Sequence, residues 1–243
     1  MTEVSESAQE AIQVLDCFYK ANIRRDEDKQ IADKEFQNEA LNNRIPLQDQ
    51  YVQWVEQKLQ MLDPNQSFVN VNNVINYSWI LDCQSKSDIL LIDSREKQKA
   101  EIDNQLINQV VLNPFGGPMD QYFAYLYIEI SRDTIIEDTL NSLIRSDINF
   151  RKPLRVKFNG ELGVDEGGVQ KEFFQLLIRK LFDPNYTMFT HREESRMLWF
   201  NGNTFESNMK FELIGMLMGI AIYNQNILDL HLPMACYKKL LDI

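Results

Sequence analysis

The chain has 243 residues, of which 44% are hydrophobic and 11% aromatic, so it can bury a substantial core and is not a disordered protein. The formal net charge of -11 argues against nucleic acid or an anionic membrane as a partner, because both are bound through clustered lysine and arginine side chains. Three widely separated cysteines, Cys17, Cys83 and Cys236, form neither a disulfide framework nor a metal-binding pair. They favour a reducing compartment, and the acidic amino terminus is unlike a signal peptide, so we expect a cytoplasmic protein for which the nucleus is a second candidate location.

The amino-terminal part of the chain is predicted to form three helices. A capping box at Ser7–Glu10 begins the first helix, which runs to about Ala21. Asp33 is placed to cap a second, short helix. The third helix begins near Gln48, and its apolar face is formed by residues at helical spacing, namely Tyr51, Val55, Leu59 and Leu62.

The middle of the chain is less regular. Residues 74–81 are apolar and fit either a helix or a strand. Residues 93–109 are rich in charge and predict a mostly exposed helix. Residues 114–118 contain two prolines and two glycines, which predicts a loop.

The remainder of the chain mixes strands with helices. Residues 122–130 and 154–158 place apolar side chains on one side and predict two strands, separated by a helix that begins after Arg132-Asp133. Residues 169–182 form the clearest amphipathic helix, with Phe173, Phe174, Leu177, Ile178 and Leu181 on one face. Residues 188–189 and 197–200 predict two further short strands around a polar turn.

Residues 211–227 form an apolar segment that is shorter than the roughly 20 residues a membrane-spanning helix needs. The segment contains Glu212, so we predict a buried core helix. Gly215 and Gly219 share one face of this helix, and they are predicted to let another element approach closely. The residues between them, Met216, Leu217 and Met218, are interpreted as core filling rather than as a cofactor site.

The most informative segment is GELGVDEGGV, residues 160–169, which lies between a predicted strand and a predicted helix. A phosphate-binding loop would need a Gly-Lys-Ser/Thr ending, which this segment does not have. The acidic side chains of the segment would also repel a phosphate. A carboxylate metal site needs several oxygen ligands, but the spacing matches no known cation-binding loop. The residues alone therefore indicate a glycine-hinged junction in which Asp165 caps the helix, with no metal and no cofactor. The residues that form this structural signature are Gly160, Glu161, Gly163, Asp165, Glu166, Gly167 and Gly168.

A family resemblance gives this segment further meaning. The sequence LRVKFNGELGVDEGGVQKEFFQLL, residues 154–177, resembles the signature near the start of the HECT domain of ubiquitin-protein ligases. The similarity continues in order through LWFN at 198–201, GIAIY at 219–223 and LDLHLP at 228–233, and it ends at residues 237–240. Weaker similarity reaches upstream over residues 125–143, and the pattern is nearest to the E6-associated-protein and HECT-domain-protein type.

The resemblance implies an α+β, mostly helical fold, the large subdomain of a HECT N-lobe with a few short antiparallel strands. It implies a helical lead-in over residues 1–145 and the start of the HECT domain over residues 146–243. Such ligases accept ubiquitin from a conjugating enzyme as a cysteine thioester and pass it to a substrate lysine. The implied partners are thus ubiquitin and a conjugating enzyme, with no nucleic acid and no membrane.

In this family the catalytic cysteine lies in a C-terminal lobe, and the conjugating enzyme docks on a small subdomain of the N-lobe. We expect both to lie beyond Ile243, so that this chain alone is an inactive part of a ligase. The alternative is a non-catalytic binding or regulatory module of the ubiquitin system.

None of the cysteines present is expected to act as the nucleophile. Cys236 stands where the family has an apolar residue and is interpreted as part of the core. Cys17 and Cys83 have no histidine near them in the sequence that would lower the pKa of a thiol. His191 is expected to be solvated and His231 to make a structural hydrogen bond, so the histidines support no metal centre.

Overall fold

The computed structural model describes residues 6–61, 73–112, 124–144, 148–161, 167–192 and 194–241. The chain divides into two compact units, Met1–Glu96 and Lys97–Ile243, and the division falls inside one long helix. Helices predominate and the strands are short, which confirms the predicted mostly helical α+β fold. The boundary predicted between residues 145 and 146 marks where the HECT domain begins in the sequence, not where one compact unit ends. It stays a prediction.

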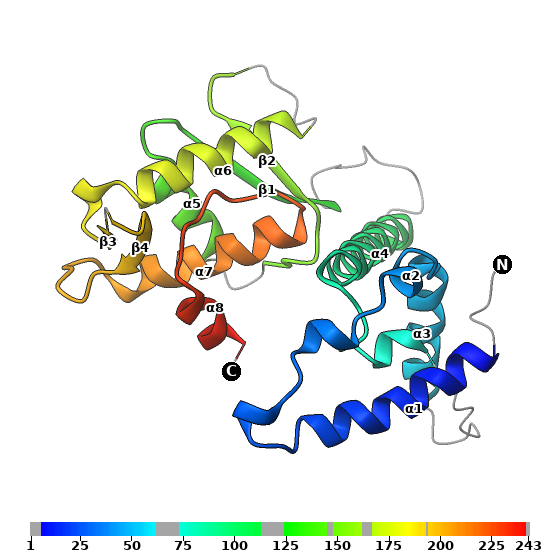
Figure 1. The fold of residues 1–243 in the computed structure, drawn as a ribbon. Coiled ribbons are helices and arrows are strands. Elements are labelled where there is room, and N and C mark those ends of the chain that lie inside the picture. Colours follow the sequence, from blue (N-terminus) through cyan, green and yellow to red (C-terminus); the bar gives the residue numbers. More distant parts are fainter. Residues whose placement is uncertain are drawn as a thin grey trace. The chain divides into compact units, whose positions relative to one another are not determined.

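The first unit is built from helices and short 3-10 turns. Its elements in chain order are α1 (Glu6–Asn22), η1 (Glu27–Lys29), η2 (Asp33–Phe36), α2 (Glu39–Asn42), α3 (Leu47–Met61), η3 (Val74–Asn76) and the first part of α4 (Cys83–Leu112), as Figure 1 shows. The first, third and charge-rich helices predicted from the sequence are thereby confirmed. Ser7 already lies inside α1, so the capping box predicted at Ser7–Glu10 does not stand at the helix start.

The single short helix predicted after Asp33 is wrong, because Asn38 divides this segment in two. Asn38 has an extended backbone, with φ -125° and ψ 104°, and its Oδ1 accepts a hydrogen bond from the Leu41 amide at 3.0 Å. An asparagine in this conformation is a favoured helix cap. Asp33–Phe36 therefore form a separate 3-10 turn, and α2 begins after Asn38.

The apolar face predicted for α3 is correct only in part. Tyr51 is buried, and its hydroxyl donates a hydrogen bond to Asp93 Oδ1 of α4 at 2.7 Å. Leu59 is 62% exposed, so it does not belong to the buried face. Leu62 lies outside the described residues.

Residues 74–81 form neither a long helix nor a strand, although they supply much of the core of the first unit. After η3 the chain continues in turns, and side-chain amides satisfy backbone groups there. Asn42 Nδ2 donates to the Ile80 carbonyl at 3.1 Å, and Gln50 Oε1 accepts from the Val74 amide at 3.4 Å. The buried apolar residues of this cluster are Ile12, Ile45, Val74, Trp79, Ile80 and Leu81.

The second unit combines strands with helices. Its elements after α4 are β1 (Leu126–Ile130), α5 (Ile135–Leu143), β2 (Leu154–Phe158), α6 (Gly168–Leu181), η5 (Pro184–Tyr186), β3 (Phe189–Arg192), β4 (Met197–Phe200), α7 (Asn208–Tyr223) and α8 (Met234–Leu240). Every strand and helix predicted after residue 121 is confirmed, with the first strand beginning at Leu126. The loop predicted at residues 114–118 lies outside the described residues.

The expectation of antiparallel strands holds for one pair and is wrong for the other. β3 and β4 pair antiparallel as a hairpin, from Phe189↔Phe200 to Arg192↔Met197. β1 and β2 pair parallel, from Leu126↔Leu154 to Ile130↔Phe158 (Figure 1). Parallel strands need a crossover between them, and α5 supplies it.

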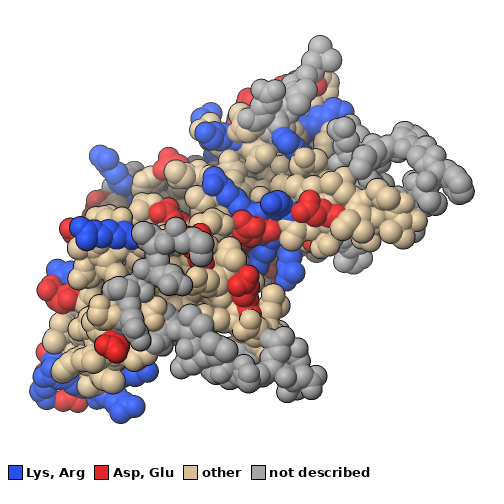
Figure 2. All heavy atoms as spheres, turned by 90° about the vertical axis from the view of Figure 1, so that its right-hand side faces the viewer, with Lys and Arg blue, Asp and Glu red and all other residues tan. Residues whose placement is uncertain are grey.

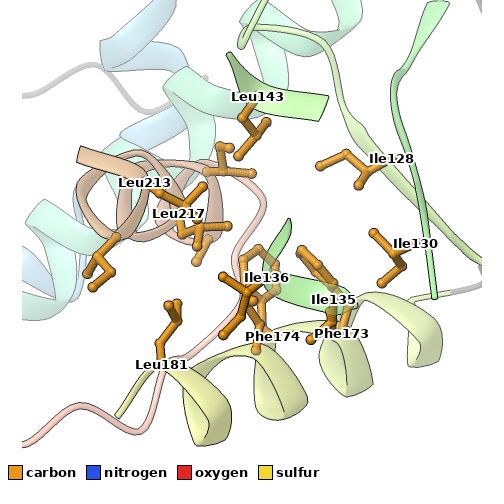
Figure 3. Packing of buried hydrophobic residues seen from close by; sticks show 14 of the residues in the cluster. Ile128, Ile130, Ile135, Ile136, Leu143, Phe173, Phe174, Leu181, Leu213 and Leu217 are labelled. Atoms are coloured by element: carbon orange, nitrogen blue, oxygen red, sulfur yellow. The ribbon is translucent and has the colours of Figure 1, made fainter. Parts of the chain in front are cut away.

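One hydrophobic core joins the strand pair to the helices of the second unit. The inner faces of β1 and β2 are buried, and Figure 3 shows side chains of α5, α6 and α7 directed into the same interior. Phe173, Leu177 and Leu213 are completely buried. Burying one side chain of this size stabilises the fold by about 1.5–3 kcal/mol. The face predicted for α6 is therefore confirmed residue by residue.

Side-chain amides close the edge of β2 that faces away from β1. Asn224 Oδ1 accepts from the Leu154 amide at 2.9 Å, and Gln170 Nε2 donates to the Leu154 carbonyl at 2.9 Å. Gln98 Nε2 of α4 also donates to Asn224 Oδ1, at 3.3 Å. Asn224 thus ties the end of α7 to the start of β2 and to α4.

The predicted core helix at residues 211–227 is present as α7, and Leu217 between the two glycines is 1% exposed. No described helix is long and apolar enough to cross a membrane. Gly215 and Gly219, however, lie on the exposed side of α7. A Cβ added at either position would meet no atom within 4 Å beyond its own helical turns in the described part of the chain. The predicted close approach of another element at these glycines is therefore wrong.

This exposure predicts that Gly215→Ala and Gly219→Ala each stabilise the chain. Alanine loses less backbone freedom than glycine when it enters a helix, so each change should raise the free energy of unfolding of the second unit by about 0.5–1 kcal/mol. Hydrogen exchange of the α7 amides measures this change. Faster exchange in both variants would show that another element does pack closely against these glycines.

Candidate functional site

The glycine-hinged junction between β2 and α6 contains two backbone conformations that favour glycine. Gly160 has φ +82° and Gly167 has φ +91°, both in the left-handed region. The Glu161 amide donates to the Phe158 carbonyl at 3.2 Å, which closes a tight turn directly after β2. The functional label of these residues as a family signature stays a prediction, but the hinge role of Gly160 and Gly167 follows from the backbone.

Gly168 begins α6, and Gly167 occupies the cap position without a side-chain hydrogen bond. The cap predicted at Asp165 stays a prediction. Gly163, Asp165 and Glu166 themselves lie outside the described residues.

Glu161 is part of an ion cluster centred on Arg132, which precedes α5. Arg132 Nε and Nη2 donate to the two Glu161 carboxylate oxygens at 2.6 and 3.0 Å, and Arg132 Nη1 donates to Glu172 Oε1 of α6 at 2.7 Å. The guanidinium also lies over the Phe158 ring, 4.4 Å from its centroid. These hydrogen bonds lower the pKa of the Glu161 carboxyl and raise that of Arg132, because each favours the charged form of its partner.

The Arg132 cluster connects three segments that are distant in the sequence. A bidentate contact between arginine and carboxylate fixes orientation as well as distance. Arg132 therefore holds the end of the β2 turn and the second turn of α6 against the loop that follows β1. The sequence alone does not reveal this pairing, since Glu161 is 29 residues from Arg132.

The entry to α5 is held by two further charged side chains. Lys180 Nζ donates to the carbonyls of Arg132 and Asp133 at 2.6 and 3.2 Å. Asp138 Oδ2 accepts from the Ser131 amide and from Thr134 Oγ1, each at 2.8 Å. The hydrogen bond from the Ser131 amide is the main reason that the pKa of the Asp138 carboxyl is lowered, and the hydrogen bond from Thr134 lowers it further.

A surface recess of about 290 Å³ adjoins this region. It lies among α5, the end of α6 and η5, and its lining residues are Asp133, Ile136, Glu137, Lys180, Asp183, Asn185 and Tyr186. The lining contains no thiol, so it lacks the nucleophile that acyl transfer to cysteine requires. Within the described ranges no group of three or more histidine, cysteine, aspartate or glutamate side chains could hold a metal ion.

The cysteines and histidines are not brought together as a catalytic pair in the described ranges. Cys236 is buried in α8, as predicted, whereas Cys17 and Cys83 are exposed. His191 is exposed but lies in β3 rather than in a turn. His231 has a 64% exposed side chain whose Nδ1 lies 3.6 Å from Asp229 Oδ1. The structural hydrogen bond predicted for this histidine is not made by its imidazole within the described residues; only its backbone carbonyl accepts one, from the Leu198 amide at 2.8 Å.

Comparison with known proteins decides the family. Residues 175–243 match the family described as HECT-domain (ubiquitin-transferase). Over 236 residues, 95% of this chain, the sequence is 36% identical to "Probable E3 ubiquitin-protein ligase HERC4" of Homo sapiens. The chain belongs to the HECT-domain family.

Other relatives of this HECT-family chain carry similar names. It is 33% identical over 234 residues, 96% of its length, to "Probable E3 ubiquitin-protein ligase HERC3" of Homo sapiens. It is 33% identical over 210 residues, 86% of its length, to "Probable E3 ubiquitin-protein ligase HECTD2" of Mus musculus. The chain spans 22% of the human HERC3 and HERC4 proteins and 25% of mouse HECTD2.

The backbone of the HECT-family junction predicts that neighbouring glycines respond differently to alanine. In the described part of the chain no atom lies within 4 Å of a Cβ added at Gly167 or Gly168, but only Gly167 has a positive φ. Gly167→Ala should therefore destabilise the second unit by about 1–2 kcal/mol, the cost of a left-handed conformation for an L-residue. Gly168→Ala is the matched control. Chemical denaturation and hydrogen exchange of the α6 amides measure the stability of both variants. Equal effects of the two substitutions would contradict the hinge role of Gly167.

The Asp138 hydrogen bonds predict a dependence of stability on pH. Because the pKa of Asp138 is lower in the folded than in the unfolded chain, its contribution is fully present above the ordinary aspartate pKa. It is lost as the pH falls through the lowered value. Asp138→Asn should cost about 1–2 kcal/mol at neutral pH and much less in strong acid. Denaturation midpoints at several pH values test this, with the exposed Glu137→Gln as control, and a pH-independent difference would refute it.

Proposed function

We propose that this HECT-family protein is a ubiquitin-protein transferase. It accepts ubiquitin from a conjugating enzyme as a thioester and transfers it to a lysine of a substrate protein. The observation that carries the proposal is the identity of 33–36% to relatives named as probable E3 ubiquitin-protein ligases over nearly the whole chain. Its implied partners are ubiquitin and a conjugating enzyme.

Within this function, the described residues act as a rigid frame rather than as the reacting group. A thioester-forming cysteine must be accessible and must have a neighbour that favours the thiolate. Cys236 is buried, with 9% of its surface exposed. Cys17 and Cys83 are accessible, but in the described ranges neither histidine hydrogen-bonds to them. We therefore propose that none of these three cysteines accepts ubiquitin.

The cellular location proposed for this function is the cytoplasm, with the nucleus as a second location. Free, exposed Cys17 and Cys83 support a reducing compartment, in which thiols are not oxidised to disulfides.

The function is tested on the natural protein. Antibodies raised against this chain isolate the protein from its source cells, and it is then incubated with activating enzyme, conjugating enzymes, ATP and ubiquitin. We expect a ubiquitin adduct that a reducing agent removes, followed by conjugates that resist reduction. A protein that binds ubiquitin or a ligase but forms no reducible adduct with any conjugating enzyme would support the alternative, a non-catalytic module.

The assignment of the cysteines is tested on the chain itself. In the same reaction mixture, the 243-residue chain should form no reducible ubiquitin adduct. The variants Cys17→Ala, Cys83→Ala and Cys236→Ala then serve as matched controls. An adduct that disappears only in Cys236→Ala would overturn the assignment of Cys236 to the core.

A further inference from the structure

The dipeptide Asn-Gly occurs twice in this chain, as Asn159-Gly160 directly after β2 and as Asn201-Gly202 directly after β4. In such a pair the backbone nitrogen of the glycine can attack the side-chain carbonyl carbon of the asparagine, because glycine has no side chain to hinder the approach. The reaction requires these two atoms to reach an attack geometry, so the contacts that restrain each asparagine decide whether it reacts.

Asn159 is exposed, and few contacts restrain its side chain. Its Nδ2 donates to Ser131 Oγ at 3.0 Å, and within the described residues its Oδ1 accepts no hydrogen bond. The Gly160 amide donates none in the same ranges either, so the attacking nitrogen is available. A Cβ added at Gly160 would meet no described atom within 4 Å, so the peptide between the two residues has room to rotate.

Asn201, in contrast, is restrained at both polar atoms of its side chain. Its Nδ2 donates to the Thr187 carbonyl at 2.6 Å, and its Oδ1 accepts from the Asn203 amide at 3.1 Å. The backbone amide of Asn201 also donates to the Met188 carbonyl at 2.9 Å. Attack by the Gly202 nitrogen would require both side-chain hydrogen bonds to break, so the fold protects this pair.

We propose that Asn159 is a site of spontaneous deamidation, with water as the only co-reactant, and that Asn201 is protected from this reaction. The Gly160 nitrogen loses its proton and bonds to Asn159 Cγ, and the side-chain nitrogen leaves as ammonia with that proton. Water then opens the resulting cyclic imide, with its hydroxyl adding to one of the two ring carbonyl carbons and its hydrogen to the ring nitrogen. Opening at one carbonyl gives aspartate, and opening at the other gives isoaspartate. The inference is independent of ubiquitin transfer.

Isoaspartate at position 159 changes the junction between β2 and α6, because it inserts one extra carbon atom into the main chain. The insertion falls inside the turn that the Glu161 amide closes on the Phe158 carbonyl at 3.2 Å. It therefore displaces Glu161, whose carboxylate accepts two hydrogen bonds from Arg132. The added charge matters less, because one further carboxylate is a small addition to a formal net charge of -11. Figure 2 shows acidic and basic side chains interspersed on the face that it displays.

Mass spectrometry of peptides from the folded chain, after incubation in mildly alkaline buffer, tests the proposal. Asn159 should deamidate about tenfold faster than Asn201 or more, since hydrogen bonds hold both polar atoms of only the second side chain. The same incubation in denaturant is the control, and there both sites should react at similar rates. Equal rates in the folded chain, or the same preference for Asn159 in denaturant, would overturn the proposal. So would an unchanged Asn159 in the folded chain after a time that converts it in denaturant.

The variant Asn159→Gln separates this modification from other effects of incubation. It keeps an amide at the exposed position but would need a larger ring, so position 159 should not react, whereas Asn201 should behave as before. An isoaspartyl methyltransferase should label the incubated original chain at position 159 and not the variant. The amides of Glu161 and of the first turn of α6 should exchange hydrogen faster in the labelled chain than in the incubated variant. Equal exchange would overturn the proposed change at the junction.

Discussion

The parallel pairing of β1 with β2 is the constraint on which the second unit depends. A parallel pair cannot close through a tight turn, so the chain must leave β1, form α5 and return to β2. The inner faces of both strands then need a cover, and the apolar sides of α5, α6 and α7 provide it. At the open edge of β2, Asn224 and Gln170 satisfy the backbone groups of Leu154, which joins the end of α7 to the strand.

The glycine-hinged junction between β2 and α6 is explained by the same arrangement. After β2 the chain must reverse into α6 within a few residues, and left-handed Gly160 and Gly167 allow this. Arg132, from the loop after β1, forms salt bridges with Glu161 on one side of the junction and with Glu172 on the other. Exposed ion pairs contribute little to stability singly, so the value of this cluster lies in orientation. These residues therefore serve as architecture at the junction.

The sequence predicts most elements because side-chain periodicity is local. The alternation in Leu154–Phe158 and the helical spacing from Phe173 to Leu181 each determine which face is buried. The alternation of side chains is the same in parallel and antiparallel strands, so it does not predict that β1 and β2 pair parallel. The close approach predicted at Gly215 and Gly219 is wrong because a small residue permits close packing without requiring it. The Arg132 cluster and the recess beside α5 depend on residues far apart in the sequence, which no local pattern can reveal.

The two strand pairs also imply different routes of assembly during folding. The β3–β4 hairpin joins residues close in sequence, such as Thr190 and Trp199, so it can form within microseconds of collapse. β1 and β2 pair residues 28 positions apart, for example Glu129 and Lys157, and this loop must close before any contact stabilises it. The strand pair that organises the core is therefore expected late, after α5 and α6 have formed. Until then, its apolar faces remain exposed to incorrect partners during synthesis.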